Sequence, residues 1–134
     1  MRYGALKLCT VLALAASASV AQEATEKIIV QPLFETVLPD LPDREGLMAT
    51  VDLPPSAEMP AHRHNANTFV YVLSGSVEMQ VEGSDMVELT EGGTFYEAPD
   101  DVHSVARNAS DSEPARLLVF FVKHKGAEVT EYVD

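Results

Sequence analysis

The 134-residue chain contains a single cysteine, Cys9, and only four histidines. Cys9 lies in an apolar N-terminal stretch that we expect to be removed on export, so the mature chain contains no cysteine. This lack excludes disulfides and thiolate ligands, and any metal must be held by nitrogen and oxygen atoms. An oxidising compartment is compatible with such a chain.

Basic residues are also scarce. The chain has 9 Lys and Arg residues against 21 Asp and Glu residues, and its formal net charge is −12. Because an acidic surface repels polyanions, this balance argues against nucleic acid and anionic lipid as partners. The acidic excess identifies no partner by itself, and solubility after export is the simpler explanation.

An apolar run long enough to span a bilayer, about 20 residues, is missing as well. The nearest candidate is an alanine-rich stretch that follows the basic residues Arg2 and Lys7 and ends in small residues at Ala21. This order is typical of a secretory signal peptide over residues 1–21, with cleavage before Gln22. We therefore expect a periplasmic or secreted protein with no membrane segment after cleavage.

The rest of the chain, residues 22–134, lacks a sustained helical period and is long enough for one domain. Short segments rich in β-branched and aromatic residues alternate with turn residues. We expect strands over 46–53, 68–73, 77–82, 86–89, 94–97, 102–107, 117–122 and 129–132. Shorter extended pieces are expected at 28–30 and 34–38, separated by proline. This spacing predicts an all-β, jelly-roll-like sandwich or barrel with little or no helix outside the signal peptide.

Three of the four histidines follow a pattern that suits a metal site. His62 and His64 are one residue apart, so an extended strand would point both imidazoles to the same side. His103 comes after a run of short predicted strands. If a facing strand brings His103 opposite the pair, three neutral imidazoles meet at one point, as in a site for a first-row metal.

Two stretches resemble the two motifs of the cupin superfamily. The stretch from His62 to Gly75 is similar to the first motif, and the stretch from Gly92 to His103 is similar to the second. The resemblance extends over about residues 46–122. It implies a cupin double-stranded β-helix barrel, present as a single domain over residues 22–134.

The resemblance also implies a metal held inside the barrel by His62, His64 and His103. Cupins usually carry a glutamate ligand shortly after the second histidine, but Thr68 occupies that position here and is at best a weak ligand. Without the glutamate the ion keeps its full positive charge. We therefore expect zinc, iron, nickel or copper rather than a hard ion such as manganese or magnesium.

A second departure from the family pattern lies in the turn before His103. Asp100 replaces the usual glycine of the second motif. Aspartate tolerates a positive φ better than most residues, so we expect the turn to survive this change.

Other side chains are candidates for roles near the metal. Tyr71 is the candidate acid, base or hydrogen-bond donor, with an ordinary core aromatic as the alternative interpretation. Glu97 is interpreted as a solvated residue at the strand edge. The apolar side chains expected to line the core or cavity are Met79, Phe95 and Phe120.

Several functions remain open from the sequence. One hypothesis is a metal-dependent dioxygenase, lyase or isomerase that acts on a small molecule. The alternative is a non-catalytic domain that binds or senses a small ligand, with or without metal, and a structural role is a third possibility. We also expect a homodimer, because open sheet edges near residues 28–30 and 34–38 pair well with a second copy.

Overall fold

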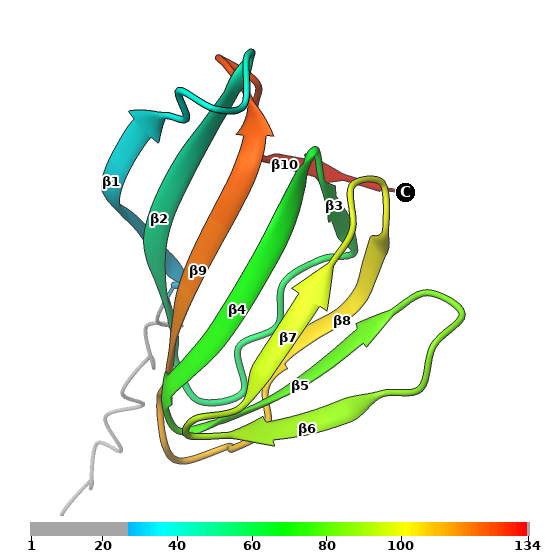
Figure 1. Ribbon diagram of the computed structural model, residues 1–134. Coiled ribbons are helices and arrows are strands. Elements are labelled where there is room, and N and C mark those ends of the chain that lie inside the picture. The colour runs from blue at the N-terminus through cyan, green and yellow to red at the C-terminus, as the bar shows by residue number, and fades with distance from the viewer. Residues whose placement is uncertain (1–26, 134) are drawn as a thin grey trace, which may run out of the picture.

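The computed structural model describes residues 27–133, which form ten β-strands and no helix (Figure 1). One five-stranded sheet has the order β1 (Ile29–Val37), β2 (Arg44–Leu53), β9 (Ala115–His124), β4 (Ala66–Ser74) and β7 (Thr94–Glu97). The other has the order β10 (Thr130–Tyr132), β3 (His62–His64), β8 (Val102–Asn108), β5 (Ser76–Val81) and β6 (Val87–Thr90). All pairs are antiparallel, so the all-β expectation is confirmed. Within residues 27–133 we find no helix with the length and apolar character to cross a membrane.

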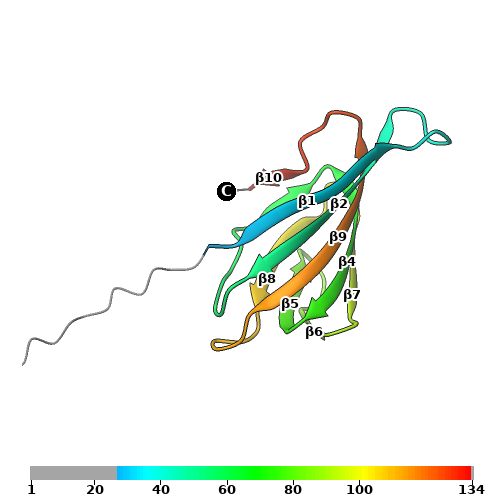
Figure 2. The ribbon, with the colours of Figure 1, turned by 90° about the vertical axis from the view of Figure 1, so that its left-hand side faces the viewer.

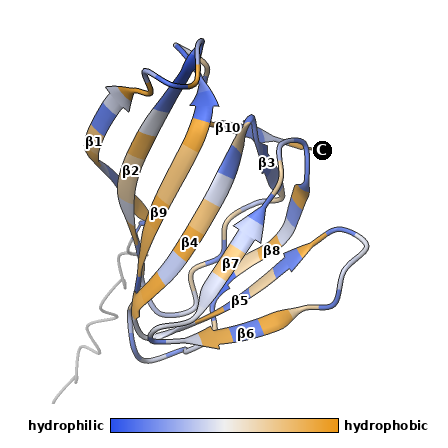
Figure 3. Ribbon diagram, viewed as in Figure 1, coloured by the Kyte–Doolittle hydropathy of each residue, from blue (hydrophilic) through white to orange (hydrophobic). Residues whose placement is uncertain are grey.

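The core lies between the two sheets and is built by alternation along the strands. In β9 every second residue, from Ala115 to Lys123, is buried, and the residues between them are half-buried or exposed. Figure 3 shows that β9 is apolar over most of its length. Because β2 and β4 flank it on either side, β9 occupies the centre of its sheet and contributes Leu117, Val119 and Phe121 to the core.

The strand β1 differs from the expected pattern of short pieces broken by proline. It runs without interruption over nine residues and pairs with β2 along the edge of the sheet (Figure 2). Pro32 is accommodated because an edge strand has one row of N–H groups without a ladder partner. The register shifts between Pro32 and Phe34, which is the irregularity that a proline in an edge strand produces.

The turn that leads into β8 sets the position of His103. Asp100 adopts a φ of 72°, so the expected positive φ at this position is present. The backbone N–H of Ala98 donates a hydrogen bond to Asp101 Oδ2 at 2.8 Å and closes the turn. The turn therefore accepts a residue with a side chain at position 100, and the side chain of Asp101 adds a local hydrogen bond.

Candidate metal centre

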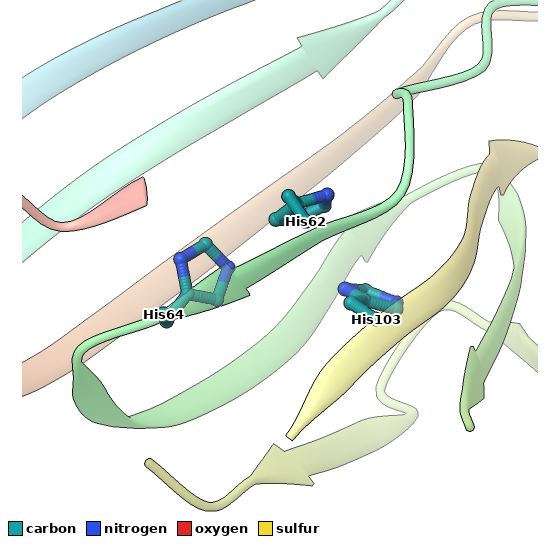
Figure 4. A group of neighbouring side chains, drawn as sticks. All are labelled: His62, His64 and His103. Atoms are coloured by element: carbon teal, nitrogen blue, oxygen red, sulfur yellow. The ribbon is translucent and has the colours of Figure 1, made fainter. Parts of the chain in front are cut away.

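The three predicted histidines meet inside the barrel. His62 and His64 project inward from β3, while Arg63 between them is half-buried and lies on the opposite face. His103 comes from β8, which is the strand next to β3, and it is the direct cross-strand partner of His62. The expectation of a facing strand was therefore wrong, because all three imidazoles come from one sheet. Figure 4 shows the three rings gathered on the same side of these two strands.

The distances within this cluster suit a shared ion. Each histidine offers one ring nitrogen, and these nitrogens lie within 4.8 Å of one another. The ring centroids of His62 and His64 are 4.8 Å apart, and those of His62 and His103 are 5.1 Å apart. All three residues are buried. The structure therefore brings together every histidine that the spacing selected, and the fourth, His124, is exposed at the end of β9.

Backbone carbonyls orient two of the rings. The Nδ1–H of His62 donates to the Pro60 carbonyl at 2.8 Å, and the Nδ1–H of His64 donates to the Val129 carbonyl at 3.1 Å. A carbonyl oxygen only accepts, so each Nδ1 must carry the proton and each Nε2 is left with its lone pair. This is the arrangement by which proteins fix the tautomer of a metal-binding histidine.

Burial also keeps these imidazoles neutral. Loss of hydration lowers the pKa of His62 and the pKa of His64 below the ordinary histidine value, and the proximity of His103 lowers both further. The neutral ring is the form that binds a metal. Since the lowered pKa favours that form, the pair is ready for an ion over a wider pH range than exposed histidines.

The buried side chain of Glu97 faces the same cluster, which the sequence reasoning missed. Only 1% of the residue is exposed, so the interpretation as a solvated edge residue was wrong. Its Oε2 lies 3.2 Å from Nδ1 of His103 and 3.8 Å from Nε2 of His64. The signal was present in the alternation: Phe95 was expected to point inward, and Glu97 is two residues further along the same strand.

Thr68 and Phe95 also belong to the surroundings of the cluster. Thr68 is fully buried and is the cross-strand partner of Glu97 between β4 and β7. The ring of Phe95 stacks on His103, with centroids 5.7 Å apart and planes 23° apart. Met79 belongs to the buried core and Phe95 packs against it, as expected for lining residues.

Tyr71 does not line the barrel. Its side chain is 45% exposed on the outer face of β4. The inner face of this strand is formed by the alternate residues Thr68, Val70 and Val72, which are buried. Phe120 likewise lies on the outer face, where its ring is 6.4 Å from Phe69. Both side chains therefore lie on the face of the sheet away from the histidine cluster. The expected role of Tyr71 as acid, base, hydrogen-bond donor or core aromatic was wrong, and so was the expected place of Phe120 in the core or cavity lining.

A small cavity adjoins the histidines. Its volume is about 70 Å³, and its apolar walls include Val51, Leu53, Val70, Leu117, Val119 and Phe121. Liquid water takes about 30 Å³ per molecule, so this space is enough for roughly two water-sized groups. A ligand of the size held by ordinary small-molecule sites, about 300–1,000 Å³, does not fit without movement of the walls.

The residues present fit a divalent transition metal. Among the described residues, the buried side-chain atoms without a hydrogen-bond partner include both ring nitrogens of His103, Glu97 Oε2 and Thr68 Oγ1. Unpaired buried polar atoms cost free energy and are rare unless an ion or ligand satisfies them. Four such atoms concentrated around three imidazoles are consistent with a metal site that uses nitrogen and oxygen donors.

Comparison with solved structures places the barrel among double-stranded β-helix proteins. An uncharacterized conserved protein with a double-stranded β-helix domain from Klebsiella pneumoniae matches with a TM-score of 0.62 and 19% identity, over 81% of this chain and 88% of that one. DMSP lyase DddQ from Ruegeria pomeroyi matches with a TM-score of 0.65 and 18% identity, over 86% of this chain but only 56% of the lyase. TT1209 from Thermus thermophilus matches with a TM-score of 0.57 and 29% identity, over 77% and 90%.

The sequence comparisons are in agreement with this fold. A search of curated proteins found no match. A family model described as a cupin domain matches residues 49–121, a span that begins in β2, ends in β9 and includes all three clustered histidines. Since that span is more than half of the chain and the barrel is the one expected, the protein belongs to the cupin family.

Proposed function

We propose that the protein is an exported cupin that binds a divalent transition metal through His62, His64 and His103 and uses it to transform a small molecule. The observation that carries this proposal is the burial of three imidazoles with their candidate ligand nitrogens within 4.8 Å of one another. A bound metal of this kind supplies a Lewis acid that polarises an oxygen or lowers the pKa of bound water. Dioxygenase, lyase and isomerase reactions all make use of such a centre.

The chain's own residues contribute orientation and exclusion of water. The carbonyls of Pro60 and Val129 hold two rings in place, so their Nε2 atoms need little reorganisation to bind an ion. The apolar walls keep bulk water away from the cavity, which strengthens electrostatic interactions inside it. The polar side chains that line the cavity together with the histidines are Thr68, Glu97 and Thr130.

A non-catalytic role in binding or sensing a small ligand is the second candidate. The observation in its favour is the cavity volume of about 70 Å³, which accepts an ion and a very small ligand but not a larger substrate. Recovery of an unchanged small ligand with the purified protein would support this role. Turnover of a diketone, a thiol or a sugar acid by the metal-loaded protein would support the enzyme.

We further propose export and self-association. The proposed signal peptide, residues 1–21, and the cleavage site before Gln22 lie outside the described residues. In favour of a homodimer, every residue of β1 is exposed although the strand carries five large apolar side chains: Ile29, Val30, Leu33, Phe34 and Val37. An apolar edge strand of this length is unusual on a monomer and suits pairing with a second copy.

Metal content tests the proposed site. We expect the exported wild-type protein to purify with close to one equivalent of a transition metal, measured by elemental analysis. The variants His62→Ala and His103→Ala should lose most of it, because each removes one of three ligands. His124→Ala is the matched control, since His124 is exposed at the end of β9 and is not one of the clustered histidines. Equal metal content in all four proteins would contradict the proposal.

A further inference from the structure

We infer that Glu97 on β7 is a fourth ligand of the metal site and replaces the carboxylate that position 68 on β4 lacks. This inference rests on the proposed function, because it concerns the same ion. The sequence motif places Thr68 where a glutamate ligand is usual, which suggested a site made of imidazoles alone. In the structure the carboxylate beside the imidazoles comes from β7 instead of β4.

The register between β4 and β7 explains how a carboxylate at position 97 can replace one at position 68. Thr68 and Glu97 are direct partners in this antiparallel pair. Side chains of direct partners point to the same face, with Cβ atoms about 4.5–5.5 Å apart. A carboxylate that starts from position 97 therefore reaches nearly the same space as one that starts from position 68, and the short side chain of Thr68 leaves that space open.

The distances to two imidazoles support a role as ligand. Glu97 Oε2 is 3.2 Å from Nδ1 of His103 and 3.8 Å from Nε2 of His64. Donor atoms that lie about 2.0–2.2 Å from one ion are separated from each other by roughly 3–4 Å, depending on the coordination angle. Both measured separations fall in this range, and they connect Glu97 to two different histidines.

The contact with His103 is not a hydrogen bond. Despite the separation of 3.2 Å, neither Glu97 Oε2 nor either ring nitrogen of His103 has a hydrogen-bond partner among the described residues. A carboxylate that only orients an imidazole accepts the ring N–H in line. This pair lacks such a hydrogen bond, so its separation fits two ligands of one ion better than a carboxylate that orients the ring. A cation between them would also remove the cost of an unpaired, buried carboxylate oxygen.

This ligand changes the metals that we expect the site to accept. Three imidazoles alone favour zinc, iron, nickel or copper, whereas an added carboxylate improves binding of harder ions such as Mn²⁺. We therefore expect measurable Mn²⁺ binding by a chain whose first motif lacks the usual glutamate. Mn²⁺ is the probe of choice, because its binding depends on the carboxylate more strongly than the binding of Zn²⁺ does.

The test is isothermal titration calorimetry of the mature protein, which measures its affinity for Mn²⁺ and, as the comparison ion, for Zn²⁺. We expect Glu97→Gln to weaken Mn²⁺ binding at least about tenfold and to weaken Zn²⁺ binding less. Glu88→Gln is the matched control, because it makes the same change at an exposed position on β6 and should leave both affinities unchanged. The double variant Thr68→Glu/Glu97→Thr returns the carboxylate to β4 and should restore most of the Mn²⁺ affinity.

The outcomes separate this inference from the proposed function. Wild-type Mn²⁺ affinity in Glu97→Gln would overturn the inference while the histidine site remains. Weakened binding that the double variant fails to restore would also overturn it, because Glu97 would then be a positioning residue for His103. Absence of metal binding by the wild type would overturn the proposed function itself. If Glu97→Gln does not fold, Glu97→Asp, whose side chain is one methylene shorter, is expected to weaken Mn²⁺ binding, and unchanged affinity would contradict the inference.

Discussion

At the scale of single residues, the burial of two polar side chains matters most for this site. His62 and His64 are held inside the barrel by hydrogen bonds from Nδ1 to backbone carbonyls. Burial without a bound cation makes the charged form of each ring unfavourable. The pH at which these rings take up protons in the metal-free protein therefore reports how strongly burial opposes their charged form.

The lowered pKa values of His62 and His64 predict a loss of stability on acidification of the metal-free protein. The unfolded chain takes up protons at the ordinary histidine pKa of 6.5, whereas the buried rings take them up only at lower pH. The unfolded state then binds more protons below pH 6.5, so the free energy of unfolding should fall as pH decreases, by up to about 1.4 kcal/mol per pH unit for each ring. Urea titrations between pH 7 and 5.5 would measure this slope.

A matched pair of variants isolates the contribution of the buried rings. His62→Asn should flatten the pH dependence, because it removes one of the two groups responsible. His124→Asn should leave the slope unchanged, since that histidine is exposed. A slope equal to that of the wild type in His62→Asn would show that other groups cause the effect.

At the scale of elements, the phase of each strand decides which residues reach the site. The strands β4 and β7 illustrate this: Thr68 and Glu97 face inward as direct partners, while Phe69 and Tyr96 form the partner pair on the outer face. A shift of one residue in the register would exchange these faces. The central strand β9 pairs with β2 and β4 and so holds the inner face of the sheet in place.

Two adjacent leucines of β9 are predicted to differ in their contribution to stability. Leu117 points into the core, and Leu118 is half-buried on the outer face. Leu117→Ala removes buried apolar volume and should reduce the free energy of unfolding by about 2–5 kcal/mol. Leu118→Ala should have a clearly smaller effect, because part of that side chain already contacts solvent. Urea unfolding of both variants checks the prediction, and equal losses would contradict the assigned phase of β9.

At the scale of the whole molecule, the apolar edge and the acidic charge act in opposite directions. The net charge of −12 favours separation of copies, whereas the exposed apolar side chains of β1 favour association. Because the edge strand offers both unpaired backbone groups and apolar side chains, we expect association to prevail at physiological salt, where repulsion is screened.

The proposed homodimer is tested by charging the edge strand. Phe34 is 61% exposed on β1, and Phe34→Glu should shift the protein from dimer to monomer in light scattering at micromolar concentration. Met86→Glu is the control, because Met86 is exposed to a similar degree but lies next to β6 in the other sheet. A wild-type protein that is monomeric under the same conditions would rule out the dimer.

Local sequence patterns determined much of this protein. The period-two alternation and the turn residues were enough to predict an all-β domain, and most predicted strands differ from the observed ones by one or two residues at their ends. The His62–His64 spacing and the second motif were enough to select the three clustered histidines. These features depend on near neighbours in the chain, so they can be read without knowledge of the fold.

Pairing between distant strands decided the rest. The alternation in β4 shows two faces but not which of them turns inward, and the structure places Tyr71 on the outer face instead of the barrel-lining one. The register that sets Glu97 opposite Thr68, and the position of β8 next to β3, arise from contacts between residues far apart in the chain. Only the tertiary structure fixes such contacts, because they form when both sheets bury their apolar faces together.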